Sequence, residues 1–118
     1  VSPDDAHPCG CAPVIFGVFD GHGRFGHKVS QLCAQRLPGH LMKQDNILEN
    51  PKKAFEVAFR DLDKEIFDHM QEEGEYSGTT AVVVLFDPTT RILHAANVGD
   101  SRAILGFNEG TSWSALAL

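Results

Sequence analysis

The segment Asp20-Gly21-His22-Gly23 groups a carboxylate, an imidazole and two glycines within four residues. It follows directly on the apolar run Val14 to Phe19, whose β-branched and aromatic residues predict a buried strand. A carboxylate at the end of such a strand is partly desolvated, which is costly unless a cation or hydrogen-bond donors compensate for it. Glycine lets a ligand approach the backbone closely and leaves its carbonyl open. These groups suit a hard metal ion with a proton donor beside it. The alternative is a plain hairpin turn, because Asp-Gly is also a strong turn signal.

Two helices are predicted after this segment. The first spans Val29 to Leu41, where apolar residues recur at helical spacing, and Pro38-Gly39 is expected to bend or end it. The second follows Asn50, a favourable N-cap residue, and has Pro51 at its first helical position. Its apolar face consists of residues that recur every three or four positions, namely Phe55, Phe59, Leu62, Ile66 and Met70.

After Gly74 the period of the sequence changes, and three further strands are predicted. They span Thr79 to Phe86, Ile92 to Val98 and Ala103 to Phe107, with turns at 87–90 and 99–101. One strand, two helices and an antiparallel meander together indicate the α+β class. Because these strands leave sheet edges and a sheet face without partners, self-association through exposed sheet edges is a hypothesis.

The composition narrows the classes of function. Sixteen Asp and Glu against ten Lys and Arg give a formal charge of -6, and the absence of a basic cluster argues against a nucleic-acid surface. The longest apolar stretch, Ala81 to Phe86, is too short to span a bilayer, so no membrane partner is expected. The cysteines Cys9, Cys11 and Cys33 lack zinc-site spacing, so we expect reduced thiols in an intracellular protein, either cytoplasmic or nuclear.

Three segments occur in a fixed order along the chain. They are Phe16-Gly17-Val18-Phe19-Asp20-Gly21-His22-Gly23, Ser77-Gly78-Thr79-Thr80-Ala81 and Asn97-Val98-Gly99-Asp100-Ser101-Arg102-Ala103. Together they closely resemble the metal-dependent serine/threonine protein phosphatases of type 2C, over most of residues 14–107. The resemblance implies part of a four-layer α-β-β-α sandwich, that is, an antiparallel β-sandwich flanked by helices, truncated in this chain. It also implies a binuclear Mg²⁺ or Mn²⁺ centre, whose activated water attacks the phosphorus of phosphoserine or phosphothreonine in protein substrates.

The resemblance assigns roles to four residues. Asp20 matches the carboxylate that bridges the two metals, and Gly21 matches the residue whose backbone carbonyl is a ligand. Asp100 matches an aspartate associated with a third, weaker metal site. His22 matches the histidine proposed as general acid for the leaving alkoxide, a role that an imidazolium suits.

Other polar residues receive plainer interpretations. Ser77-Gly78-Thr79-Thr80 is interpreted as the start of a strand, and Ser101 and Arg102 as turn and surface residues. Arg24 either reaches a substrate phosphate or is solvated, and we favour the solvated alternative. Among the histidines, surface positions are expected for three and a core or interface position for the last: His27, His40, His69 and His94.

Residues 1–118 are therefore interpreted as an incomplete type 2C phosphatase catalytic domain, with a loop-like segment at 1–13 and a recognisable core at 14–107. The family's upstream phosphate-binding arginine and Glu-Asp pair have no counterpart here, where only Asp4 and Asp5 occur, and its later metal aspartates would lie beyond Leu118. Because Mg²⁺ demands near-octahedral oxygen coordination, we expect weak metal binding and little or no phosphatase activity from this chain alone.

Two other classes of function remain open. One is a non-catalytic, phosphatase-like binding or regulatory module that keeps the fold without the chemistry. The other is a hydrolase that uses Ser, His and Asp, which is disfavoured because the chain contains no Gly-x-Ser-x-Gly segment.

Overall fold

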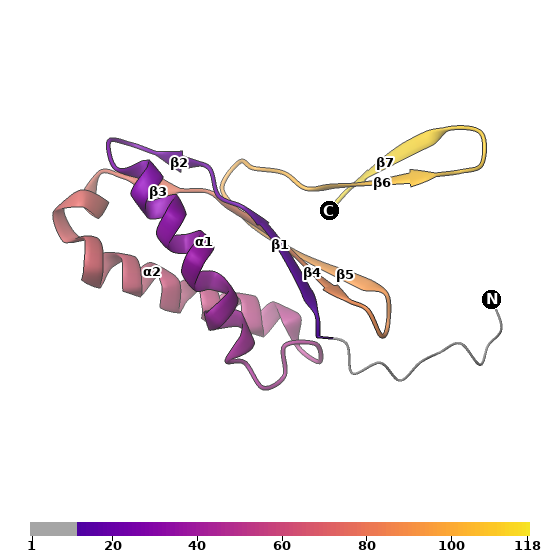
Figure 1. Ribbon diagram of the computed structural model, residues 1–118, viewed down its shortest axis with the longest axis horizontal. Coiled ribbons are helices and arrows are strands. Elements are labelled where there is room, and N and C mark those ends of the chain that lie inside the picture. Colours follow the sequence, from indigo (N-terminus) through magenta and orange to yellow (C-terminus); the bar gives the residue numbers. More distant parts are fainter. Residues whose placement is uncertain (1–11) are drawn as a thin grey trace.

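Within residues 12–118, the fold combines two helices with one three-stranded sheet and two short strand pairs (Figure 1). It is seen in a computed structural model that describes residues 12–118. The α+β class predicted from the sequence is confirmed. In chain order the elements are β1 (Val14–Val18), β2 (Gly21–His22), α1 (Gly26–Met42), α2 (Pro51–Glu75), β3 (Gly78–Thr79), β4 (Ala81–Asp87), β5 (Ile92–Val98), β6 (Ile104–Asn108) and β7 (Trp113–Ala117).

The central strand of the sheet is β4, which pairs antiparallel with β1 on one side and with β5 on the other. Its alternate residues Val83 and Leu85 are fully buried against both helices. The opposite face is open in the described part of the chain, where Phe16 and Val18 of β1 are 59% and 63% exposed. The predicted first strand is therefore confirmed, but the prediction that it is buried is wrong, because in residues 12–118 α1 and α2 cover a single face of the sheet.

Helix α1 is longer than the sequence suggested. It begins at Gly26 and continues through Pro38 to Met42. Of the two expected effects of Pro38-Gly39, an end of the helix there is wrong. Leu37 and Leu41 are buried on either side of the proline, and the Gly39 carbonyl still accepts a hydrogen bond from the Lys43 amide at 3.2 Å. Burial of this face against α2 outweighs the loss of one backbone donor at the proline.

Helix α2 forms as predicted. The Asn50 side chain caps it by accepting a hydrogen bond from the Lys53 amide at 3.3 Å, and Pro51 occupies the first turn. The predicted apolar face packs into the core, with Phe55 and Leu62 buried. The helix is kinked at Gln71, whose backbone is not helical. Neither helix in residues 12–118 combines the length and apolar character needed to cross a membrane.

The predicted three-stranded meander is only partly correct. β4 and β5 pair as expected, and the turn between them is closed by the Asp87 carboxylate, which accepts hydrogen bonds from Thr89 and Thr90. The next strand, β6, pairs with β7 and not with β5. Gly99, at φ +100°, follows the end of β5, and the β6–β7 hairpin extends away from the helices (Figure 1). Sequence periodicity predicts a strand here but does not specify its partner.

Candidate metal centre

Two carboxylates lie at the same end of the three-stranded sheet. Because β1 and β5 each pair antiparallel with β4, they run parallel to each other, and their carboxyl ends meet at one edge. Asp20 follows the end of β1 by two residues, and Asp100 follows the end of β5 by two residues. The start of β4 lies between them. The topology thus brings together two residues that are far apart in the sequence.

Thr80, the residue before β4, contacts both of these strand ends. Its amide donates to the Asp20 carbonyl at 2.9 Å, and its hydroxyl accepts from the Asp20 amide at 3.1 Å. The same hydroxyl lies 2.5 Å from the hydroxyl of Ser101. The Thr80 methyl group packs against Gly99, where a Cβ atom would lie 2.9 Å from it. Thr80 therefore fixes the backbone at Asp20 and at the turn that carries Asp100.

The glycines around His22 are required by close backbone packing. A Cβ atom on Gly21 would lie 2.2 Å from the Gly26 carbonyl oxygen, where α1 begins. Gly23 has φ +81°, and a Cβ atom there would lie 2.4 Å from the Tyr76 carbonyl oxygen. The alternative of a plain hairpin turn is wrong, because Gly21 and His22 form the short strand β2, which pairs with β3. The segment is thus held rigidly between β3 and α1.

The His22 ring lies over Gly78, its partner in the β2–β3 pair. A Cβ atom on Gly78 would lie 2.7 Å from His22 Nε2, so the absence of a side chain at this position makes room for the ring. Ser77, the residue before Gly78, is anchored as well, because its hydroxyl accepts a hydrogen bond from the Phe25 amide at 2.9 Å. The imidazole is therefore presented on a fixed backbone, and His22 itself is exposed.

The oxygen atoms exposed at this end of the sheet are of the types that bind a hard divalent cation. Asp20, Gly21 and Asp100 are all exposed and offer two carboxylates and a carbonyl, which are ligands that Mg²⁺ and Mn²⁺ prefer. In number they are fewer than an octahedral shell requires. Within residues 12–118, no three His, Cys, Asp or Glu side chains are grouped so that they could hold a metal ion. The described residues can therefore supply part of a coordination shell.

Several other residues that the sequence analysis considered do not belong to this group of ligand atoms. Arg24 is exposed, with its guanidinium 5.4 Å from the centre of the Phe25 ring, in line with the solvated interpretation. Burial raises the pKa of the Cys33 thiol to about 11, with Asp63 and Glu65 adding to the effect, so this cysteine is an unreactive core residue. Four predicted or considered residues lie outside the described part of the chain, namely Asp4, Asp5, Cys9 and Cys11.

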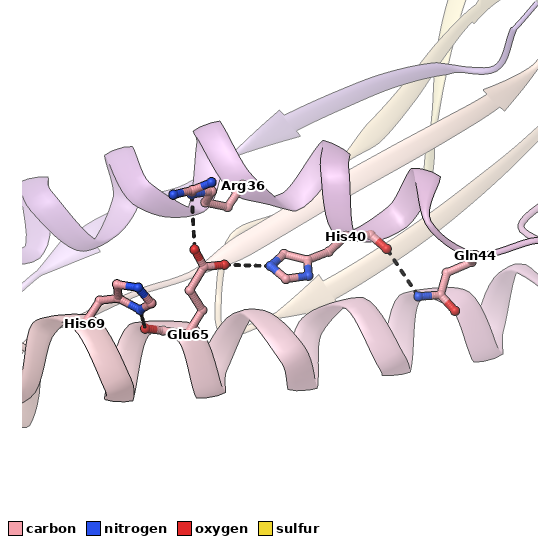
Figure 2. A network of polar contacts seen from close by, with 5 residues as sticks. All are labelled: Arg36, His40, Gln44, Glu65 and His69. Carbon is pink, nitrogen blue, oxygen red and sulfur yellow. Dashed lines mark hydrogen bonds and ion pairs between the residues drawn. The ribbon is translucent and has the colours of Figure 1, made fainter.

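A second polar cluster joins the two helices (Figure 2). Glu65 of α2 binds Arg36 Nε at 3.1 Å and His40 Nε2 at 2.7 Å, both on α1. The hydrogen bond from His40, assisted by Arg36, holds the pKa of Glu65 below its ordinary value of 4.5, although burial opposes this shift. The prediction that His40 is a surface residue is wrong, because its side chain is only 14% exposed. His69 is exposed as expected and contacts the Glu65 carbonyl.

Sequence reasoning missed the contribution of Thr80 and Ser101. The sequence predicts the start of a strand for one segment and a turn for the other, and both descriptions are accurate locally. The hydroxyl contacts join residues that are 60 and 21 positions apart, so no local pattern reveals them. The sequence does show a hydroxyl residue in each segment, because Thr80 comes directly before β4 and Ser101 directly after Asp100.

Comparison with known proteins supports the resemblance. The family profile described as protein phosphatase 2C matches residues 9–116. Probable protein phosphatase 2C 64 of Oryza sativa subsp. japonica is 40% identical over 111 residues, covering 89% of this chain and 26% of the relative. Protein phosphatase 2C homolog 3 of Schizosaccharomyces pombe is 37% identical over 116 residues, covering 90% of this chain and 27% of the relative. Probable protein phosphatase 2C 35 of Arabidopsis thaliana is 39% identical over 95 residues, covering 80% and 26%.

The fold and the three ordered segments, together with these similarities, define the class as that of the protein phosphatases. Within that class, the chain belongs to the protein phosphatase 2C family. It spans about a quarter of the length of the three relatives.

Proposed function

We propose that this chain forms part of the catalytic domain of a metal-dependent protein serine/threonine phosphatase, which hydrolyses phosphoserine and phosphothreonine monoesters in proteins with Mg²⁺ or Mn²⁺. The observation that carries the proposal is the convergence of Asp20 and Asp100 at one sheet edge, with His22 on the adjoining short strand. Membership of the family supports the same reaction class.

The residues of this chain would divide the work between binding and proton transfer. The Asp20 carboxylate, the Gly21 carbonyl and the Asp100 carboxylate would hold the cations, and bound metal would supply charge neutralisation and an activated water. The His22 imidazole would donate a proton to the serine or threonine alkoxide, which is otherwise a poor leaving group. The tight packing of Gly21 and Gly23 keeps the ring and the carboxylate on one rigid segment, which suits a reaction that depends on positioning.

The isolated chain is expected to be a weak catalyst. Two carboxylates and one carbonyl leave about half of an octahedral Mg²⁺ shell to water, so affinity and rate should both be low. We propose that the remaining ligands come from other parts of a longer protein, because this chain spans about a quarter of its relatives.

The test compares hydrolysis of a phosphothreonine peptide by this chain and by the longer protein that contains it. We expect little turnover by the chain alone, and Mn²⁺-dependent turnover by the longer protein that EDTA removes. In the longer protein, Asp20→Asn should lower the rate by at least about a hundredfold. If the longer protein does not hydrolyse the peptide at any Mn²⁺ concentration, the chain belongs to a non-catalytic binding or regulatory module. Turnover that is insensitive to EDTA would indicate a metal-independent hydrolase.

A further inference from the structure

Ser101 has more contacts than a surface turn residue needs. It follows Asp100 directly and is only partly exposed. Its hydroxyl lies 2.5 Å from the Thr80 hydroxyl, and its carbonyl accepts a hydrogen bond from Asn97 Nδ2 at 2.7 Å. The Asn97 contact ties Ser101 back to the end of β5, whereas the Thr80 contact ties it across to the start of β4. The turn that carries Asp100 is thus held from two sides.

The contact to Thr80 extends to Asp20. The Thr80 hydroxyl also accepts a hydrogen bond from the Asp20 amide at 3.1 Å, and the Thr80 amide donates to the Asp20 carbonyl at 2.9 Å. A continuous chain of hydrogen bonds therefore runs from the Asp20 backbone through the Thr80 hydroxyl to the Ser101 hydroxyl. Linked hydrogen bonds polarise and strengthen one another, so a change at one end is felt at the other.

We propose that Ser101 is a positioning residue that fixes Asp100 relative to Asp20 through Thr80, so that the two carboxylates bind cations as one coupled site. This inference rests on the proposed function, because it takes the two aspartates as ligands. The physical need is clear from the backbone, since both aspartates lie two residues beyond their strands and both are exposed. Without a cross-link between the turns, each carboxylate would have to be ordered separately when a cation binds, which costs affinity.

The first arm of the test needs no metal. Amide hydrogen exchange of Asp20, measured by NMR on the whole chain, reports the strength of its hydrogen bond to Thr80. Ser101→Ala removes the hydroxyl and leaves the Asn97 contact to the backbone carbonyl in place. We expect exchange at Asp20 to become about three- to tenfold faster, as for the loss of one hydrogen bond. Ser101→Thr should restore it, and Ser112→Ala, at an exposed serine between β6 and β7, should have no effect.

The second arm adds Mn²⁺ alone and follows paramagnetic broadening of the Gly21 and Asp100 amide signals. In the unaltered chain both signals should reach half of their full broadening at the same Mn²⁺ concentration, which is the midpoint of the titration. In Ser101→Ala the two midpoints should separate by about threefold or more, since a lost hydrogen bond is worth that factor. The inference is overturned if Ser101→Ala changes neither the exchange at Asp20 nor the common midpoint.

Failure of the proposed function has a different signature. If Mn²⁺ broadens neither signal in the unaltered chain, the proposed cation site is wrong. Amide hydrogen exchange at Asp20 then still decides whether Ser101 links the turns that carry Asp20 and Asp100. A purely structural role for Ser101 would change exchange at Asp20 but leave the two midpoints equal, which also contradicts the inference.

Discussion

Glu65 illustrates how much a single, largely buried carboxylate contributes to the helical layer. Its two oxygens bind different residues of α1, Arg36 and His40 (Figure 2). Its side chain is only 16% exposed. A charge-assisted pair in such a position is worth more than a surface ion pair, because water screens it less. Glu65 therefore joins α1 to α2 by a polar contact beside the apolar core.

The pH dependence of folding should reflect this contact. The pKa of Glu65 is lowered in the folded chain, so the stabilisation is present above the pKa of the unfolded chain and is lost as the pH falls through the lower folded value. Glu65→Gln should lower the free energy of unfolding at pH 7 by about 1 kcal/mol. The difference from the unaltered chain should shrink below about pH 4.5, the ordinary value. Urea denaturation at a series of pH values measures both quantities.

Glu56→Gln is the matched control, because Glu56 is an exposed residue of the same helix. We expect it to leave the free energy of unfolding nearly unchanged. If the two variants have the same effect at pH 7, Glu65 is not a link between the helices.

At the scale of elements, the junction between β2 and α1 depends on glycine. Gly21 and Gly26 are in such close backbone contact that a Cβ atom on either would overlap the other. Gly39, further along α1, has open space around it. A glycine-to-alanine substitution should therefore have opposite effects at Gly21, in β2 beside the start of α1, and at Gly39, in the last turns of α1.

Gly21→Ala should destabilise the chain by roughly 2–4 kcal/mol, because the added methyl group overlaps backbone atoms that cannot move independently. Gly39→Ala should stabilise it by about 0.8 kcal/mol, because alanine loses less conformational freedom in a helix than glycine does. Thermal and urea denaturation of both variants measure these changes. Equal effects at the two positions would show that the junction is not tightly packed.

The elements were predictable to the extent that their signals are local. The capping residue and apolar face of α2 determine that helix within its own sequence, and it forms as predicted. The continuation of α1 through Pro38 depends on burial of Leu37 and Leu41 against α2, which no local pattern shows. Likewise, the positions of Asp20 and Asp100 at strand ends followed from the sequence, whereas their link through Thr80 and Ser101 depends on strand pairing.

Among the residues that the structure describes, the sheet of the molecule is covered on one face only. Helices α1 and α2 pack on that face, while Phe16 and Val18 stand exposed on the other, within residues 12–118. An apolar sheet face of this kind tends to find a partner when it is left in water. The sequence predicts self-association through exposed sheet edges, and β1, which carries these two residues, is an edge strand of this sheet.

Sedimentation velocity should show that the isolated chain associates as its concentration rises. Phe16→Lys should shift the population toward monomer, because it places a charge in the open face of β1. Phe67→Lys is the control, since Phe67 is 78% exposed but lies on α2. A chain that stays monomeric throughout, or one that Phe67→Lys dissociates equally well, contradicts this prediction.

We propose that the ends of β1 and β5 provide one part of the cation site of a protein phosphatase 2C domain. The most direct measurement is an NMR titration of the whole chain with Mn²⁺. We predict saturable broadening centred on Gly21 and Asp100, with a dissociation constant on the order of millimolar, as expected for an incomplete oxygen shell. Asp20→Asn should abolish it at both positions, and Asp61→Asn, at an exposed position on α2, should not. Broadening that persists in Asp20→Asn, or that centres elsewhere in the chain, would show that these strand ends do not form the cation site.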